Sequence, residues 1–305
     1  NQFDYQSCLC YLQVNFMDQI KLFLELTRFK RPIGYMLLFW PCAWGLTLAY
    51  DFSNDLKLYL FYLILFFLGS VLMRSAGCII NDIVDREFDK KVSRTKDRPI
   101  ASGKISVRLG LIYATILCFL ALLVLINFNY LTIILAFCSM PLAFTYPLMK
   151  RYTYWPQLFL GITFNYGLLL GWTSIENSIN LIPIILYFGA IFWTLGYDTI
   201  YGYQDITDDE IIGVKSTSIK FKDNPKKFLF ICYSITILSY IFVGIYMNFN
   251  FFLYLGIIIM SFHLFFFQIR LFDQTNIQKC LKIFKSNNFF GFIVLAFIFL
   301  GKISI

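Results

Sequence analysis

The chain has 305 residues, of which 59% are hydrophobic and 14% are charged, and its formal net charge is +8. Soluble domains carry about one quarter charged residues, so this composition, with a mean hydropathy of +0.68, excludes an ordinary soluble protein. The basic residues are spread among short connections between apolar segments, a distribution typical of membrane topology rather than of a nucleic-acid partner. We therefore predict an all-α integral membrane protein whose partner is the lipid bilayer.

The first predicted element is the segment 18–31, DQIKLFLELTRFKR. Ile20, Phe23, Leu24 and Leu26 fall near one face of a helix, with charged residues around them. This pattern is typical of an amphipathic helix that lies in the membrane interface and leads into the first span. A plain cytosolic extension is the alternative.

Apolar segments of about 20 residues follow, which is the length that crosses the hydrocarbon layer as a helix. We predict that residues 1–305 form a single bundle of about nine transmembrane helices. The predicted spans are 32–50, 57–80, 107–126, 130–148, 155–174, 181–200, 228–247, 251–271 and 287–303.

Basic residues indicate the orientation of the bundle. Of the 26 Lys and Arg residues, 24 belong to alternate connections or their edges, and only Lys57 and Lys302 fall on the other side. The positive-inside rule therefore predicts a cytoplasmic N-terminus and a C-terminus across the membrane. The two long charged connections, 81–106 and 201–227, then face the cytoplasm and are where we expect the active site. We expect a bacterial inner membrane, with the mitochondrial inner membrane as the alternative.

The first long connection begins with NDIVDREFDK, residues 81–90. Asn81, Asp85 and Asp89 are spaced i, i+4 and i+8, which places them on one face of a helix. Asp82 points off this stripe, and we interpret it as a solvated charge.

The second long connection contains YDTIYGYQDITDDEIIGVKST, residues 197–217. Asp205 and Asp209 are four residues apart, and Asp198 lies seven residues before Asp205, so all three are predicted to share one stripe. Asp208 and Glu210 are interpreted as solvated charges.

Two stripes of carboxylate and amide oxygens suit hard divalent cations, especially Mg²⁺, which is commonly shared with substrate phosphates. Strong bases such as Arg94 and Arg98 follow the first stripe, and guanidinium groups beside metal-binding carboxylates are expected of a diphosphate site. A salt-bridged solvated loop that only fixes topology is the alternative. A transporter or channel would place ionisable residues near the middle of its spans, whereas here, apart from Arg74 and His263, they gather at one membrane face.

These motifs resemble a known family. GCIINDIVDREFDKKVSRTKDRPIASG (77–103), the second motif, RPIG (31–34) and FTYPLMKR (144–151) are similar to signatures of the UbiA-type intramembrane prenyltransferases. Within that family the sequence is most similar to the 4-hydroxybenzoate polyprenyltransferases of ubiquinone biosynthesis. The resemblance implies Mg²⁺-dependent transfer of a polyprenyl group from polyprenyl diphosphate to the ring of 4-hydroxybenzoate, ortho to its hydroxyl. Another aromatic or quinoid acceptor is the alternative.

The resemblance also implies roles for the acidic residues. Asn81 and Asp85 would hold one Mg²⁺, and Asp205 and Asp209 would hold the other. Asp89 and Asp198 would assist Asp85 and Asp209 in catalysis, in contact with the metal or one shell away.

For the substrates, the resemblance and the residue types point to basic side chains near the motifs. Arg94, Arg98 and Lys150 are expected to bind diphosphate oxygens, with Arg31 as a further candidate. Tyr146 matches a family tyrosine near the leaving group, although an interfacial aromatic residue is the alternative. The benzoate carboxylate would pair with Arg151 or Arg74. Arg74 lies within a predicted span and needs an anionic partner, for which Asp198 would serve as well as substrate.

Overall fold

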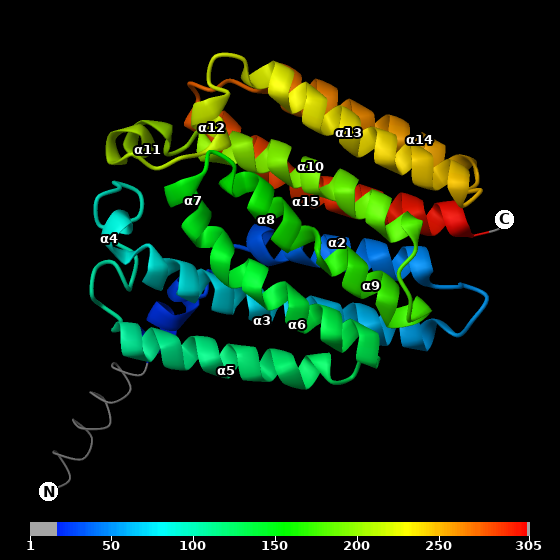
Figure 1. Cartoon of the computed structure of the whole chain (residues 1–305), viewed down its shortest axis with the longest axis horizontal. Helices are drawn as coiled ribbons and strands as arrows, with labels where there is room; N and C mark the ends of the chain where they lie inside the picture. Colours follow the sequence, from blue (N-terminus) through cyan, green and yellow to red (C-terminus); the bar gives the residue numbers. More distant parts are fainter. Residues whose placement is uncertain (1–16, 304–305) are drawn as a thin grey trace, which may run out of the picture.

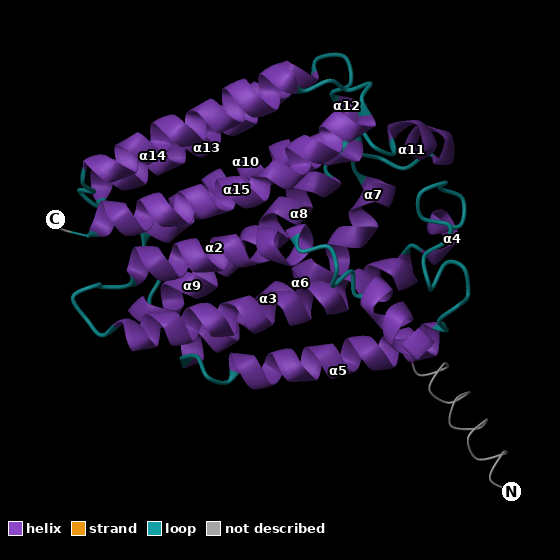
Figure 2. Ribbon diagram, turned by 180° about the vertical axis from the view of Figure 1, so that it is seen from behind, coloured by secondary structure: helices purple, strands orange, loops and turns teal. Residues whose placement is uncertain are grey.

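The structure is a computed structural model that describes residues 17–303, and within this range every regular element is a helix (Figures 1 and 2). The long helices lie side by side along the longest axis of the molecule. In chain order the elements are α2 (Ile33–Ala49), α3 (Leu56–Val84), α4 (Arg86–Asp89), α5 (Val107–Leu125), α6 (Tyr130–Thr145), η1 (Tyr146–Leu148), α7 (Met149–Tyr152), α8 (Pro156–Asn165), α9 (Gly167–Glu176), α10 (Leu181–Gly202), α11 (Ile206–Ile212), α12 (Thr217–Lys220), α13 (Pro225–Tyr246), α14 (Phe251–Ser261), the π-helical η2 (Phe262–Arg270) and α15 (Ile277–Lys302).

The predicted membrane bundle is confirmed. In the described part of the chain, 8 helices are long and apolar enough to cross a membrane, and the shorter apolar α2 adds 17 residues. One boundary is wrong, because α15 begins at Ile277 and not near residue 287. The lysines in its first turns lower the local hydropathy, so the apolar pattern does not reveal this part of the helix. Cys280 and Ile283 are nevertheless buried in the bundle.

The predicted amphipathic segment is helical over residues 17–26 and ends earlier than expected. Its apolar face packs on the bundle: Leu26 is fully buried with Ile79 of α3, and the Phe23 ring meets Tyr113 of α5 edge-on, with 5.1 Å between centroids. Residues 27–30 then form a turn in which Arg28 adopts a left-handed φ of 53°. The segment is therefore a packed part of the bundle rather than a plain extension.

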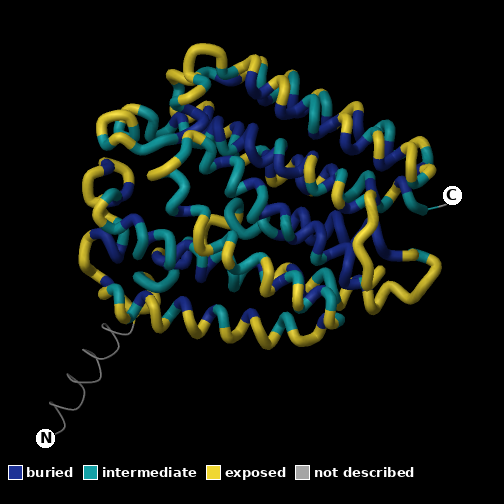
Figure 3. The backbone as a smooth tube through the Cα atoms, in the orientation of Figure 1, coloured by how far each residue is buried: buried dark blue, intermediate teal, exposed yellow. Residues whose placement is uncertain are grey.

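Close helix packing sets the centre of the bundle, where most residues of α2, α9 and α10 are buried (Figure 3). Helix α2 packs against α9, α3 and α15. Two glycines allow α2 and α9 to approach closely: a Cβ at Gly171 would lie 2.2 Å from Cys42 O, and one at Gly45 would lie 2.0 Å from Leu168 O. Small residues at such crossings are typical of membrane helices, whose association depends on van der Waals contact.

Replacing Gly171 by alanine is expected to destabilise the protein by about 3 kcal/mol or more, because the added methyl overlaps backbone atoms that cannot move aside. The melting temperature of the detergent-solubilised protein measures the effect. Gly77→Ala is the matched control, since a Cβ at Gly77 would meet nothing within 4 Å. Equal melting temperatures for the two variants would contradict the tight α2–α9 crossing.

The short helices gather at one end of the bundle. Helices α4, α7, α11 and α12 all lie at the end where the two acidic motifs connect the long helices (Figures 1 and 2). The beginning of α3 and the end of α15 lie at the opposite end.

Candidate active site

The first acidic motif continues from the end of α3. The helix ends at Val84, Asp85 leaves helical geometry with φ −92° and ψ 3°, and α4 follows at once. Asp85 N donates to Asn81 O at 2.9 Å and Asp89 N donates to Asp85 O at 2.8 Å, so the i, i+4 spacing is kept across the break. The predicted alignment of Asn81, Asp85 and Asp89 is confirmed in the backbone.

The second motif is divided between two helices. Asp205 precedes α11, and Asp209 N donates to Asp205 O at 2.8 Å, which keeps this pair one turn apart as predicted. Helix α10 ends at Gly202, however, so Asp198 belongs to a different helix. The prediction that Asp198 shares a stripe with Asp205 and Asp209 is therefore wrong, because a turn at residues 203–204 interrupts the helix.

Two contacts join the motifs, which are more than one hundred residues apart in the sequence. Arg94 donates to both carboxylate oxygens of Asp205, with Nε 2.7 Å from Oδ1 and Nη2 2.5 Å from Oδ2. Ser93 N donates to Asp208 Oδ2 at 3.3 Å. Asp208 thus helps to join the loops, and its interpretation as a merely solvated charge is wrong. Glu210 is exposed and pairs with Lys222 at 2.8 Å, as expected of a surface charge.

Lys150 places a positive charge between the motifs. Its Nζ lies 2.6 Å from Asp85 Oδ2, while the other oxygen of this buried carboxylate, Oδ1, has no hydrogen-bond donor among the described residues. Lys215 N, near the end of the second motif, donates to Lys150 O at 2.9 Å and joins α7 to that motif. The structure thus brings Asp85 and Lys150 together with the second motif.

The electrostatics of the acidic residues indicate a shortage of positive charge. Burial and the neighbouring Asp205 raise the pKa of Asp209 to about 6, although Lys150 and Arg94 act in the opposite direction. Burial also raises the pKa of Asp85, and Lys150 offsets this only in part. Carboxylates in this state gain from any further cation that enters between them.

Asp82 is the clearest correction to the sequence analysis. It is 1% exposed and accepts from Arg28 Nη2 at 2.5 Å and from Arg98 Nη1 at 3.1 Å, so it is a buried anion and not a solvated charge. Arg98 also donates to Asp89 at 2.8 Å. Sequence reasoning missed Arg28, because no local pattern separates it from Arg31; the left-handed turn after the first helix carries it to Asp82.

An apolar cavity of about 490 Å³ lies within the bundle, between α2, α3, α5, α6, α8 and α9. Two predicted substrate residues line it, Arg74 and Tyr146. The guanidinium of Arg74 lies 5.5 Å from the centre of the Phe164 ring, and its buried Nε has no hydrogen-bond partner in the described chain. Within that range Arg74 forms no ion pair with Asp198, so its expected internal partner is not in contact.

The remaining predicted substrate residues differ in their surroundings. Arg151 donates to Val84 O at 2.8 Å and stacks over Phe88 at 5.0 Å, so it holds the first motif in place. Arg31 is exposed before α2 and makes no side-chain hydrogen bond or ion pair with any described residue. Arg31 is therefore the one predicted substrate residue that these contacts do not link to the motifs or the cavity.

The donor set fits a hard divalent cation. No group of three His, Cys, Asp or Glu side chains within residues 17–303 is close enough to hold a metal alone. The unpartnered Oδ1 of Asp85, the carboxylates of Asp205 and Asp209 and the amide of Asn81 offer oxygen ligands. Mg²⁺ usually binds through a few such ligands and takes the rest from water and substrate phosphate.

Comparisons with known proteins agree with this geometry. Residues 38–298 match the model of the UbiA prenyltransferase family. The chain is 41% identical over 293 residues to the mitochondrial 4-hydroxybenzoate polyprenyltransferase of Dictyostelium discoideum, covering 94% of the chain but only 62% of that protein's length. It is 40% identical to 4-hydroxybenzoate geranyltransferase 1 of Lithospermum erythrorhizon, covering 96% of the chain and 94% of that enzyme.

The fold is also similar to solved structures. The structure of a UbiA homologue from Archaeoglobus fulgidus bound to DMAPP and Mg²⁺ superposes with a TM-score of 0.62 at 19% identity. The match covers 90% of this chain and 99% of the other, so the two share one fold over nearly their whole length.

Proposed function

The chain belongs to the UbiA prenyltransferase family, and from this premise we propose that it is the enzyme that transfers a polyprenyl group to 4-hydroxybenzoate. The donor is polyprenyl diphosphate, and the new bond forms ortho to the phenol hydroxyl in ubiquinone biosynthesis. The observation that carries the proposal is that the acidic motifs and Lys150 lie next to one end of the apolar cavity. Tyr146, in the cavity wall, lies one turn before Lys150, and Gly77 lies one turn before Asn81.

Asn81, Asp85, Asp205 and Asp209 are the residues that would hold magnesium. The metal, when bound, supplies positive charge that makes diphosphate a better leaving group. The unpartnered Asp85 oxygen supports this assignment, and a related protein has been solved with DMAPP and Mg²⁺.

Arg94, Arg98 and Lys150 supply charge for the diphosphate oxygens. In the structure each of them pairs with a carboxylate, at 2.5 to 2.8 Å, so internal ion pairs compensate these three cations. Asp89 keeps Arg98 in position through one of these pairs. A diphosphate accompanied by a metal ion can take over both sets of charges without leaving one of them uncompensated.

Arg74 is the better candidate for the acceptor carboxylate. Arg151 already donates a hydrogen bond to Val84 O and lies 3.9 Å from Asp85. The Nε of Arg74, in the cavity wall, has no hydrogen-bond partner among the described residues. A benzoate entering the cavity would meet that donor. The prenyl chain would occupy the apolar remainder of the cavity.

We expect Arg74→Gln to raise the Michaelis constant for 4-hydroxybenzoate about ten- to a hundredfold, because a charge-assisted contact is worth roughly 1.5–3 kcal/mol. The Michaelis constant for the prenyl diphosphate should change little. The neutral analogue 4-hydroxybenzamide is the control substrate, since it has no carboxylate to lose. If the variant discriminates between the two acceptors as well as the parent protein does, Arg74 does not bind the carboxylate.

The proposed function is tested with purified protein in Mg²⁺ buffer, offered 4-hydroxybenzoate and other phenolic or quinoid acceptors. Each acceptor is combined with geranyl and longer prenyl diphosphates, because the related enzymes are named for both geranyl and polyprenyl transfer. Prenylated 4-hydroxybenzoate as the main product supports the proposal. Turnover of a different acceptor in its place would assign the chain to another branch of the family.

Within residues 17–303, eight helices are long and apolar enough to cross a membrane, so the chain is a multi-pass membrane protein. We propose the mitochondrial inner membrane as its location. The related polyprenyltransferases are named as mitochondrial, and the predicted bacterial location has no such support. The basic residues at the motif end support, by the positive-inside rule, an orientation in which that end faces the matrix.

This orientation predicts which introduced cysteines react with an impermeant thiol reagent applied from the intermembrane side. In a background without native cysteines, Ser178→Cys should be labelled, while Lys96→Cys and Asp223→Cys should be protected until the membrane is opened. All three positions are exposed in the structure, so accessibility reports only the side of the membrane. The reverse labelling pattern would invert the topology.

A further inference from the structure

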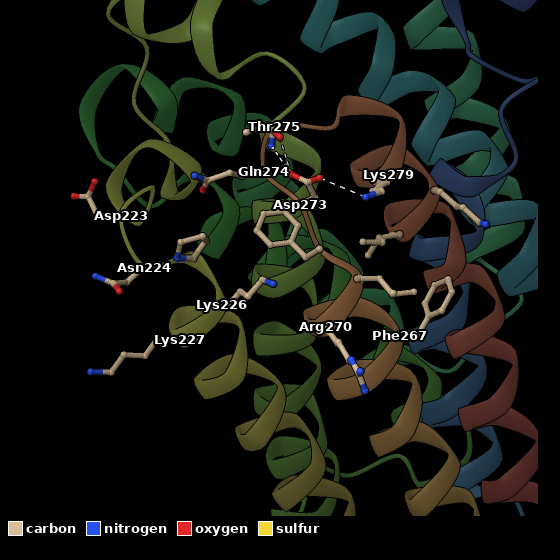
Figure 4. A pocket seen from close by; sticks show the side chains of 15 residues that line it. Asp223, Asn224, Lys226, Lys227, Phe267, Arg270, Asp273, Gln274, Thr275 and Lys279 are labelled. Atoms are coloured by element: carbon tan, nitrogen blue, oxygen red, sulfur yellow. Dashed lines mark hydrogen bonds and ion pairs between the residues drawn. The ribbon is translucent and has the colours of Figure 1, made fainter.

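A second concavity, of about 870 Å³, opens at the same end of the bundle as the acidic motifs. The amino end of α13, the end of η2, the following loop and the first turns of α15 form its walls (Figure 4). It shares no lining residue with the apolar cavity and none with the residues proposed for prenyl transfer. We refer to it as the basic pocket.

Positive charge dominates the basic pocket. Within the described chain only Lys279 of its cations is paired, at 3.4 Å from Asp273, and that carboxylate also accepts from Thr275. The amino terminus of α13 has no side-chain cap, which adds the partial positive charge of a helix end. The lining cations are Lys226, Lys227, Arg270, Lys279 and Lys282, against the carboxylates Asp223 and Asp273.

Apolar side chains continue from the pocket along the outer face of the bundle. Leu271, in its wall, is 48% exposed, and Phe266, one turn before Arg270, is 41% exposed. The Arg270 guanidinium stacks 4.8 Å from the centre of the Phe266 ring, so the charged and apolar surfaces meet at that residue. A free anion would use only the charged part, whereas a lipid would use both.

The pocket is a fixed part of the fold. Gln268, in the π-helical segment between two lining residues, accepts from Tyr233 Oη at 2.6 Å and donates to Asn287 Oδ1 at 2.9 Å. Phe272 and Ile283, which also line the pocket, are each 3% exposed. Three helices therefore hold the cations around the concavity before any ligand arrives.

We infer that the basic pocket binds the phosphate headgroup of an anionic phospholipid, whose acyl chains lie along the exposed apolar face of η2. Basic pockets between membrane helices at the positively charged side of a bilayer suit this ligand class. Scattered surface lysines and arginines that only fix the topology would attract any anionic surface weakly. A preformed concavity instead binds its ligand saturably and with a defined stoichiometry. The site is independent of the prenyl-transfer reaction.

The test uses the whole 305-residue chain in detergent, titrated with dioleoylphosphatidylglycerol, dioleoylphosphatidylcholine or inorganic phosphate. Melting temperature and native mass spectrometry report stabilisation and the number of retained lipids. The test variant is Lys226→Gln/Arg270→Gln/Lys282→Gln. The matched control, Lys30→Gln/Lys104→Gln/Arg108→Gln, removes as many exposed positive charges, all predicted to lie on the same side of the membrane and none of them lining the pocket.

We expect one phosphatidylglycerol per protein to be retained by the parent and by the control variant, with a saturable rise in melting temperature. The test variant should need roughly a hundredfold more lipid for half-saturation, since each basic residue near an anionic surface contributes about fivefold. Equal responses of the two variants, or equal binding of phosphatidylcholine, would overturn the inference. Inorganic phosphate that reproduces the full stabilisation through the same three residues would also overturn it, because the ligand would then be a free anion.

Discussion

Asp85→Asn and Asp209→Asn are each expected to reduce prenyl transfer by about a hundred- to a thousandfold at saturating Mg²⁺, the range measured for losing one preorganised electrostatic contact. Each change keeps the size of the side chain and removes the negative charge that attracts a cation. Asp85 presents an oxygen without a donor, and burial with a like charge nearby raises the pKa of Asp209 to about 6. Each carboxylate is therefore only partly compensated by other residues, as expected of groups that bind a cation.

Glu210→Gln is the matched control, because it removes a charge from the same motif at an exposed pair with Lys222. Its activity should equal that of the parent protein. Turnover is measured together with the Mg²⁺ concentration for half-maximal rate, which should rise in the two aspartate variants. Full activity in excess chelator, or in either folded aspartate variant, would contradict the two-metal assignment.

Asp82→Ala is expected to lower the free energy of unfolding by about 3–5 kcal/mol, the range found when one partner of a buried ion pair is removed. Asp82 is 1% exposed and is the shared anion of Arg28 and Arg98, so its loss leaves Arg28 without an ion-pair partner among the described residues and Arg98 with Asp89 alone. Arg28→Ala should lower the free energy of unfolding by a smaller amount, because Arg98 still compensates the charge of Asp82. The melting temperature in detergent is the measurement.

Asp18→Ala serves as the control for Asp82, because its pair with Lys21 is 3.5 Å long and both side chains are more than half exposed. Surface pairs of this kind contribute about 0–1 kcal/mol, so the melting temperature should hardly change. If Asp82→Ala and this control have the same melting temperature, the ion pairs of Asp82 with Arg28 and Arg98 do not hold the helix at residues 17–26 against α3.

Several features followed from the sequence because they depend on neighbours along the chain. Apolar runs of about twenty residues predict membrane helices wherever they occur, and all nine predicted spans have a helical counterpart. The spacing of Asn81, Asp85 and Asp89 predicts a common face, and backbone hydrogen bonds keep that spacing through the break at Asp85. The one poor boundary, at the start of α15, is a place where burial rather than local hydropathy decides the helix.

Other features depend on which distant segments meet, and no local pattern carries that information. Arg28 and Asp82 are 54 positions apart, and Arg94 and Asp205 are 111 apart, so their pairing is decided only when the helices pack. Packing likewise separates Asp198 from Asp205 by ending α10 at Gly202, and it leaves Arg74 without a partner in the cavity wall. The sequence alone therefore determined a helical membrane protein with two acidic motifs, because hydropathy and helical period act over a few turns. The tertiary structure alone decided which charges are paired, buried or free, because that depends on contacts between helices far apart in the chain.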